Sequence, residues 1–302
     1  MIPERLTALR EKMRAYGVDA YLVPTADYHE SEYVGTYFKA RTYITGFTGS
    51  AGTAVITQKE ACLWTDGRYF VQAAKELAGT GVTLMKMGQE NVPTVEEYLL
   101  ANTKEGMTIG FDGRVVNEML GETLEKTLPE RFLSYRSDLI GEIWSDRPAL
   151  SAEPVWILND AYTGESAADR LAKVREKMQE NGAEVHILTA LDDIAWMLNI
   201  RGNDIPCNPV VLSYLVLTKT EGHLFIQEET LNNEVKQYLA DLDIQLHPYD
   251  AVYNFVAGIS GKTILLEKAK VNYTICQSVM EDNTIINMMN PASALKAVKT
   301  PV

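Results

Sequence analysis

The segment Arg5–Gly17, RLTALREKMRAYG, returns later in the chain as Arg170–Gly182, RLAKVREKMQENG. Seven of the thirteen positions are identical, at a constant offset of 165 residues. Leu6, Leu9 and Met13 recur at helical spacing, which predicts an amphipathic helix that ends at a glycine. A β-strand is expected directly after each helix. The chain therefore contains one structural design used twice.

The elements that follow the two helices come in the same order. A hairpin is predicted at 53–65, where TAVIT and ACLWT flank a short turn, and its counterpart is expected at 214–227. A helix is expected after this second hairpin, from about Glu229 to Leu239. The strand GMTIGFD at 106–112 likewise matches GKTILLE at 261–267. Helices alternate with these strands. The pattern indicates an α/β fold made of two tandem domains, each a mixed β-sheet flanked by helices.

The repeat also sets the expected domain boundaries. Residues 1–147 are predicted to form the first domain, 148–166 a linker that contains Pro and Gly, and 167–302 the second domain. A length of 302 residues suits two domains with separate cores.

The composition argues against several classes of function. A formal net charge of -13 disfavours nucleic acid and anionic membranes as partners. Three cysteines without CxxC spacing are expected to be reduced and buried among apolar neighbours. No apolar run reaches the roughly 18 residues of a membrane span, and the first residues do not resemble a secretory signal. These features predict a soluble, cytoplasmic protein.

Two groups of residues in the first half are candidates for chemistry. The glycine-rich stretch Arg41–Gly52 precedes a strand and lacks a following GK[ST], so tight turns are favoured over phosphate binding. Asp27, His29, Glu32 and Asp66 could bind a metal or share a proton. No serine or cysteine stands in a pattern typical of a catalytic nucleophile.

One segment of the second half combines stiffness with polarity. The segment Trp196–Tyr214 carries two prolines and the polar residues Arg201, Asn203 and Asp204. Polar groups on a stiff loop are typical of an interface or a pocket wall. An internal salt bridge from Arg201 to Asp204 is the alternative interpretation.

Several motifs together resemble the amino-terminal half of the three-domain Xaa-Pro aminopeptidases, which belong to the creatinase/prolidase family. The similarity extends over essentially the whole chain, and LWTDGRY and IRGNDIPCNP are its most specific motifs. The runs that carry it are ADYHESEYVG at 26–35, RTYITGFTGSAG at 41–52, LWTDGRY at 63–69, the segment 196–214 and the closing ALKAVKTPV.

The resemblance implies two tandem creatinase/prolidase amino-terminal domains, followed in a complete protein by a pita-bread catalytic domain that this chain lacks. In that family the catalytic domain binds two divalent ions, usually Mn²⁺, through two aspartates, a histidine and two glutamates. A metal-bridging hydroxide then attacks the bond before a penultimate proline. None of these ligands transfers to a position of this sequence. We therefore assign no catalytic residue, metal ligand or cofactor to the chain and expect it to be inactive alone.

The resemblance implies an indirect role in the enzyme. The two domains are expected to contact their own catalytic domain and a second subunit, and to shape the entrance for peptides with a penultimate proline. A free-standing α/β module that binds a ligand or acts as a scaffold is the first alternative, and a hydrolase built on Asp27, His29, Glu32 and Asp66 is the second. The residues expected at the interface or substrate entrance are Asp66, Arg68, Arg201, Asn203 and Asp204.

Overall fold

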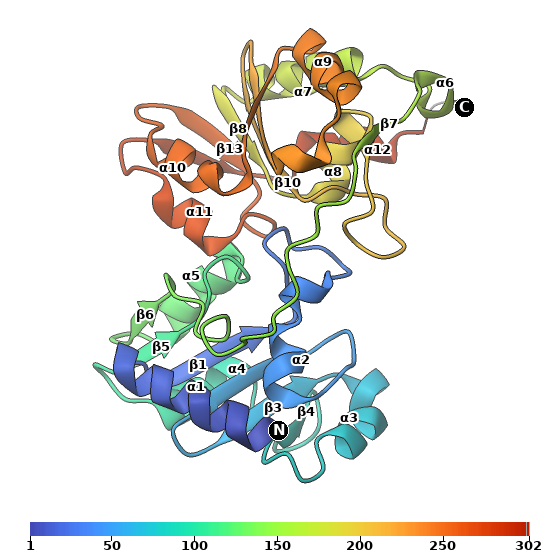
Figure 1. Cartoon of the computed structure of the whole chain (residues 1–302). Coiled ribbons are helices and arrows are strands. Elements are labelled where there is room, and N and C mark those ends of the chain that lie inside the picture. The colour runs from blue at the N-terminus through green and yellow to red at the C-terminus, as the bar shows by residue number, and fades with distance from the viewer. Residues whose placement is uncertain (300, 302) are drawn as a thin grey trace. The chain divides into compact units, whose positions relative to one another are not determined.

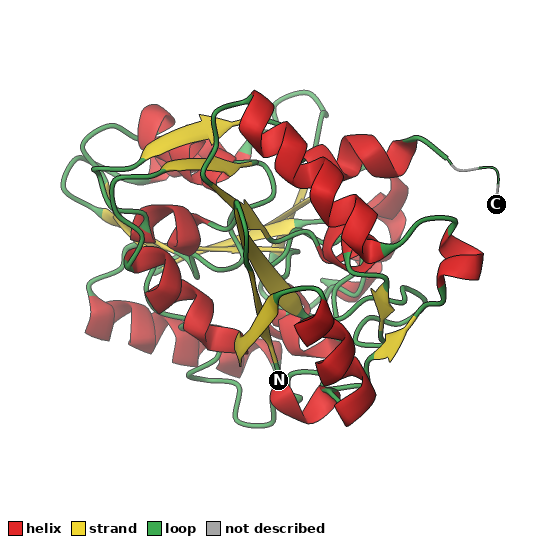
Figure 2. Ribbon diagram, turned by 90° about the horizontal axis from the view of Figure 1, so that it is seen from above, coloured by secondary structure: helices red, strands yellow, loops and turns green. Residues whose placement is uncertain are grey.

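The computed structural model describes residues 1–299 and 301 of the chain. These residues form two compact α/β units. Unit 1 contains Met1–Asp27 and Thr36–Ala149, and unit 2 contains Tyr28–Gly35 and Leu150–Val302. Helices and strands alternate along both; Figure 2 shows the helices in red and the strands in yellow. No helix in the described part of the chain is both long enough and apolar enough to cross a lipid bilayer.

Figure 1 labels most of the elements of both units. Those of unit 1 are α1 (Ile2–Tyr16), β1 (Ala20–Pro24), η1 (Thr36–Phe38), α2 (Ala40–Thr45), β2 (Thr53–Thr57), β3 (Ala61–Thr65), η2 (Gly67–Tyr69), α3 (Phe70–Glu76), β4 (Thr83–Lys86), α4 (Val95–Asn102), β5 (Thr108–Gly110), α5 (Glu118–Thr127) and β6 (Phe132–Ser134). Those of unit 2 are β7 (Trp156–Ile157), α6 (Asp160–Thr163), α7 (Ala167–Glu180), β8 (Val185–Leu188), α8 (Leu191–Met197), β9 (Ile200–Arg201), β10 (Ser213–Thr218), β11 (Gly222–Ile226), η3 (Glu228–Thr230), α9 (Asn233–Asp241), β12 (Ile244–Pro248), η4 (Tyr249–Ala251), α10 (Val252–Ala257), β13 (Thr263–Leu266), α11 (Tyr273–Ser278), β14 (Thr284–Asn287) and α12 (Pro291–Ala297).

The two main sheets have the same topology. The strand order is β4-β3-β2-β1-β5-β6 in unit 1 and β12-β11-β10-β8-β13-β14 in unit 2. In each sheet one strand, β2 or β10, runs antiparallel to its two neighbours, and the remaining pairs are parallel. The other five strands of each sheet therefore end on the same side, which we call the carboxyl edge. The predicted pair of mixed α/β domains is confirmed.

Each sheet is buried on both faces because successive apolar side chains of its central strands point to opposite sides. In β3, Leu63 joins the core beneath α1, whereas Trp64 points to the other face and meets Tyr98 of α4, with ring centroids 5.1 Å apart. In unit 2, Leu224 packs under α7 and α9, whereas Phe225 meets the Phe255 ring on the opposite face. This alternation is the period-two pattern of a sheet covered on both sides.

The repeated helix keeps the same role in both units. Arg5 of α1 donates to the carbonyl of Tyr43 and stacks on its ring, 4.0 Å from the centroid. Arg170 of α7 donates to the carbonyl of Trp196 and stacks on its ring, 4.4 Å from the centroid. Each arginine therefore attaches its helix to the next helix of the unit, α2 or α8. Gly17 follows α1 in the predicted left-handed conformation, with φ of 66°.

Several predicted boundaries move in the structure. The expected linker 148–166 contributes β7 and α6 to unit 2, and β7 pairs with β9. The first half of the glycine-rich stretch is helical, because α2 runs to Thr45 and only Gly46–Gly52 forms a loop. The helix expected from Glu229 begins at Asn233, since the Asn232 side chain accepts from the Val235 N–H and caps it there.

Candidate functional site

Most of the residues singled out in the sequence lie at the carboxyl edge of one of the two sheets. Asp66 and Arg68 follow β3, and the loop 46–52 leads into β2 at that same edge. In unit 2 the loop 202–212 leads into β10 at the corresponding edge. Open α/β sheets bind ligands outside the carboxyl ends of their strands. The two carboxyl edges are therefore the candidate regions for function.

The Asp66–Arg68 turn is exposed, and hydrogen bonds between its two charged residues hold it in one conformation. Asp66 accepts from the Arg68 backbone N–H at 3.0 Å and from its Nε and Nη2 at 2.9 Å each. These bonds lower the pKa of Asp66 to about 2. The Arg68 side chain remains 70% exposed. The turn can therefore present a fixed guanidinium to a partner, while its carboxylate is already engaged by that guanidinium.

Hydrogen bonds from Arg41 and close packing fix the conformation of the glycine-rich loop. The guanidinium of Arg41 is buried and donates Nη1 to the Phe47 carbonyl at 2.5 Å and Nη2 to the Gly49 carbonyl. Its Nε donates to Thr25 Oγ1 at 2.9 Å. Burial lowers the pKa of Arg41 to about 10, so it remains charged at neutral pH. All three of these donors point to the loop or its support, which fits tight turns rather than phosphate binding.

We predict that Gly49→Ala lowers the free energy of unfolding of unit 1 by about 1–3 kcal/mol. A Cβ at this position would lie 2.2 Å from the Phe47 ring and 2.8 Å from the Tyr69 ring. Phe47 is fully buried and cannot move freely. Gly67→Ala is the matched control, since its Cβ would meet nothing closer than 3.9 Å. Equal thermal midpoints for the two variants would contradict this account.

Asp204 holds the polar loop of unit 2 from inside. Its carboxylate is buried and accepts from the backbone N–H groups of Glu153 at 3.0 Å and Leu212 at 2.8 Å. Arg201 instead donates to the carbonyls of Ala195 and Ile200. Within the described residues, the alternative Arg201–Asp204 salt bridge does not form.

The exposed part of the same loop is its tip. Asn203 is exposed, whereas Asp204 beside it is buried. Pro206 and Cys207 are also exposed, and Cys207 has a φ of 63°. The prediction that all three cysteines are buried is therefore wrong for Cys207, because the turn directs it outward, and correct for the other two. Asn203 and the tip, rather than Asp204, are available to a partner.

The proposed acidic and histidine cluster of the first half does not assemble as a metal site. Both ring nitrogens of His29 are used within unit 2, by the Thr189 carbonyl and the Tyr249 hydroxyl. Asp66 is bonded to Arg68 in unit 1. Among residues 1–299 and 301, no three or more His, Cys, Asp or Glu side chains are grouped to hold a metal ion.

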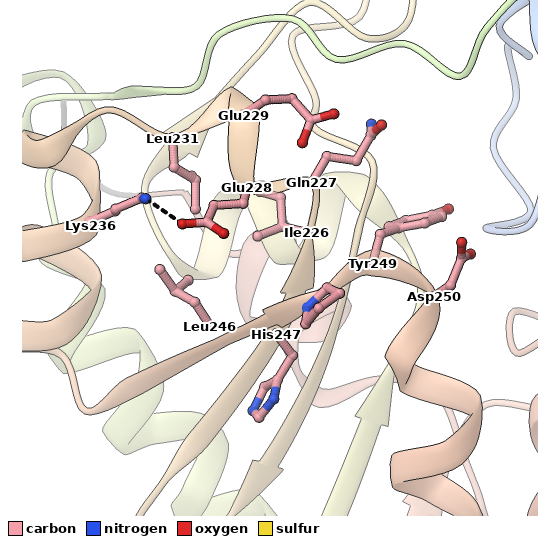
Figure 3. A pocket seen from close by; sticks show the side chains of 11 residues that line it. Ile226, Gln227, Glu228, Glu229, Leu231, Lys236, Leu246, His247, Tyr249 and Asp250 are labelled. Atoms are coloured by element: carbon pink, nitrogen blue, oxygen red, sulfur yellow. Dashed lines mark hydrogen bonds and ion pairs between the residues drawn. The ribbon is translucent and has the colours of Figure 1, made fainter.

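A pocket of about 500 Å³ opens at the carboxyl ends of β11 and β12. Figure 3 shows Glu228 and Lys236 pointing toward one another on one side, joined by an ion pair of 2.8 Å, with Tyr249 and Asp250 on the other. Its apolar floor is formed by Ile226, Leu231 and Leu246. The lining contains three carboxylates, on Glu228, Glu229 and Asp250, and one lysine, Lys236. The pocket suits a small ligand with an apolar part and a positive charge.

The sequence did not predict this pocket, because the helix expected from Glu229 covered the loop that forms one of its walls. In the structure α9 begins only at Asn233. The available signal was the pairing of acidic residues directly after two strands, QEE at 227–229 and PYD at 248–250. Parallel strands bring such segments together at one edge of a sheet.

A histidine pair lies next to the pocket. Nδ1 of His223 is 3.1 Å from Nε2 of His247, so one ring donates to the other only while the acceptor is neutral. Burial lowers the pKa of His223, His247 lowers it further, and Glu221 opposes the shift. The folded state therefore resists protonation at this site.

We predict that unit 2 loses stability as the pH falls below the ordinary histidine value of 6.5. The unfolded chain then binds a proton that His223 excludes in the folded state, so the free energy of unfolding decreases with falling pH. His247→Gln should reduce this dependence between pH 7.5 and 5.5, because it removes the neighbour that lowers the pKa of His223 further. Chemical denaturation at several pH values measures the slope. Identical slopes for the variant and the original chain would contradict the assignment.

Comparison with known proteins gives a consistent result over the whole chain. A family model described as creatinase/prolidase N-terminal domain matches residues 5–142, and a second with the same description matches residues 146–302. A probable Xaa-Pro aminopeptidase P of Talaromyces marneffei is 38% identical over 99% of this chain and 47% of that protein. Xaa-Pro aminopeptidase app-1 of Caenorhabditis elegans is 36% identical over 92% of this chain and 47% of that protein.

A solved structure is also similar along the full length. The X-prolyl aminopeptidase from Caenorhabditis elegans, described as a cytosolic enzyme with a di-nuclear active site, matches with a TM-score of 0.92 and 32% identity. The match covers 100% of this chain and 52% of that one. The chain thus spans about half the length of these relatives. With a family model matched to each half and the same sheet topology in both units, the chain belongs to the creatinase/prolidase N-terminal domain family, as two such domains in tandem.

Proposed function

We propose that this chain is the amino-terminal, non-catalytic portion of a metal-dependent Xaa-Pro aminopeptidase, a cytoplasmic hydrolase that removes the residue before a penultimate proline. The observation that carries the proposal is the full-length similarity to an X-prolyl aminopeptidase of which the chain covers 52%. The di-nuclear centre named for that enzyme would lie in the part that this chain does not match. A pair of metal ions, manganese in our proposal, would activate water and polarise the peptide carbonyl there.

The chain would contribute contacts and shape. We assign the contacts with the catalytic domain, with a second subunit or with the peptide substrate to the two carboxyl edges. Arg68 supports this assignment because its guanidinium is exposed yet held in place by Asp66. Asn203 supports it because it is exposed on a loop held by buried Asp204. Arg201 and Asp204 would act by positioning this loop.

The first test is the reading frame beyond Val302. The proposal expects it to continue into a region with spaced aspartates, a histidine and two glutamates. A stop codon directly after Val302 in the intact transcript would contradict the proposal and would favour the free-standing module. The pocket beside β11 and β12 is the observation that favours that second candidate, because a ligand could bind there without any further domain.

The second test examines the contribution of the carboxyl edge in the full-length protein. Arg68→Glu is expected to lower kcat/KM for peptides with a penultimate proline, or to change the preference for peptide length. Lys104→Glu makes the same charge change at an exposed position that precedes β5, on the opposite edge of the same sheet. The control should retain both properties. Equal kinetics for the two variants and for Asn203→Ala would contradict the proposed role of these residues.

A further inference from the structure

A short segment from the first half of the sequence belongs to unit 2. Met1–Asp27 and Thr36–Ala149 belong to unit 1, whereas Tyr28–Gly35 is part of unit 2. We call this segment the strap. The chain therefore crosses between the units three times rather than once. The strap lies entirely outside the range matched by the second family model, which begins at residue 146.

Both ring nitrogens of His29, in the strap, form hydrogen bonds with residues of unit 2. The side chain is 1% exposed. Nδ1 lies 2.9 Å from the Thr189 carbonyl oxygen, and Nε2 lies 2.6 Å from the Tyr249 hydroxyl. A neutral imidazole with its hydrogen on Nδ1 satisfies both contacts, since Nδ1 donates to the carbonyl and Nε2 accepts from the hydroxyl. Both ring nitrogens of His29 are therefore hydrogen-bonded within unit 2.

Aromatic rings and a backbone contact complete the fit. The His29 ring centroid is 4.5 Å from that of Tyr214 and 5.8 Å from that of Tyr249. The two tyrosine rings also contact one another at 5.1 Å. The Asn272 side chain donates Nδ2 to the Tyr28 carbonyl at 3.1 Å, so the strap backbone is held as well. We call Thr189, Tyr214, Tyr249 and Asn272 the socket.

The socket is built at the carboxyl edge of the unit 2 sheet. Thr189 directly follows β8, Tyr249 directly follows β12, and Tyr214 stands near the start of antiparallel β10. Asn272 belongs to the turn after β13 and caps α11. This is the position at which open α/β sheets bind ligands. In unit 2 the position is filled by a peptide segment of the same chain.

We propose that the carboxyl edge of unit 2 is a peptide-binding site for a histidine-bearing segment, and that the strap occupies it as an internal ligand. Unit 2 is then incomplete without residues that precede its own family domain by more than a hundred positions. This role of the strap in the folding of unit 2 does not depend on the proposed function.

The test replaces His29 with alanine in the full chain and follows hydrogen exchange in each unit by mass spectrometry. Loss of both buried hydrogen bonds should make opening of unit 2 about tenfold more frequent or greater, read from peptides that cover β10 and β12. Peptides of β2 and β3 should keep their exchange rates. Free imidazole at millimolar concentration should restore protection in His29→Ala, because it fits the vacated socket.

Two further variants keep the test decisive if His29→Ala folds poorly. Tyr249→Phe removes only the hydroxyl that donates to His29 and should give a smaller increase in exchange confined to unit 2. Glu32→Gln changes an exposed side chain of the strap and should leave exchange unchanged. The effects of His29→Ala and Tyr249→Phe should be less than additive, since both remove the same hydrogen bond.

Two results would overturn the proposal. One is unchanged exchange in β10 and β12 for both His29→Ala and Tyr249→Phe. The other is a dimer of the original chain by light scattering that His29→Ala converts to monomer, because the strap would then occupy the socket of a second copy rather than its own. A monomer that shows the expected exchange pattern and imidazole rescue would support the proposal.

Discussion

Replacing Arg170 with methionine is expected to lower the free energy of unfolding of unit 2 by about 3–5 kcal/mol. The guanidinium is buried, donates to the Trp196 carbonyl at 2.5 Å and to the Asn199 side chain, and lies 3.5 Å from a Glu165 oxygen. Methionine fills part of the volume but leaves these acceptors without their donor. Thermal and urea unfolding, followed by circular dichroism, measure the loss.

Arg5→Met is the matched comparison because Arg5 occupies the same position of the repeat. Arg5 is only half-buried, and its guanidinium donates to the Tyr43 carbonyl. We expect a loss of about 1–2 kcal/mol, which is confined to unit 1. A larger loss for Arg5→Met than for Arg170→Met would contradict the view that burial decides the cost.

Replacing Arg41 with methionine is also expected to be strongly destabilising. It should lower the free energy of unfolding of unit 1 by about 3–5 kcal/mol. The change leaves the buried carbonyls of Phe47 and Gly49 without the guanidinium that donates to them. The loop 46–52 should then open more often than the rest of the unit. Hydrogen exchange of this loop, together with chemical denaturation, measures both consequences.

Arg68→Met serves as the control for Arg41→Met. Both arginines belong to unit 1, but the Arg68 side chain is 70% exposed and its partner Asp66 can be hydrated when the guanidinium is removed. The unfolding midpoint of this control should stay close to that of the original chain. A comparable loss in both variants would show that the buried carbonyls are not the cause.

Most of the fold could be predicted from the repeat in the sequence. The seven identities between Arg5–Gly17 and Arg170–Gly182 preserve an apolar stripe, a stacking arginine and a terminal glycine, and all three have the same role in the two units. The hairpin of TAVIT and ACLWT was located correctly because its alternation and turn are local features. Local patterns therefore predicted the elements and their order.

Features that depend on distant residues could not be predicted in this way. No local pattern indicates that His29 contacts Thr189 and Tyr249, which lie 160 and 220 positions away. The polarity of Asp204 suggested exposure, yet two backbone N–H groups satisfy its carboxylate inside the loop. Acidic and histidine side chains near one another in sequence suggested a metal site, whereas His29 is hydrogen-bonded within unit 2 and Asp66 to Arg68 within unit 1.

The residues selected from the sequence as interface or entrance candidates remain a prediction in their role, although their positions in the fold are now known. Asp66 and Arg68, and the loop that contains Asn203, were selected for polarity and stiffness, and both lie at a carboxyl edge. The pocket beside β12 was not predicted, because it needs the parallel pairing of β11 with β12 to bring its two acidic segments together. Sheet order, which only the structure supplies, decides which segments share an edge.

We propose that the machinery for cleaving peptides lies outside these two domains. Calorimetric titration of Mn²⁺ into the purified chain is the sharpest test, because a di-nuclear centre would bind ions in a fixed ratio. We expect no stoichiometric uptake, and the titration should show only weak, salt-sensitive association with the acidic surface. Saturable binding of two Mn²⁺ ions per chain would contradict this proposal. The binding heat should then be reproduced when a chelator removes the ions and the titration is repeated.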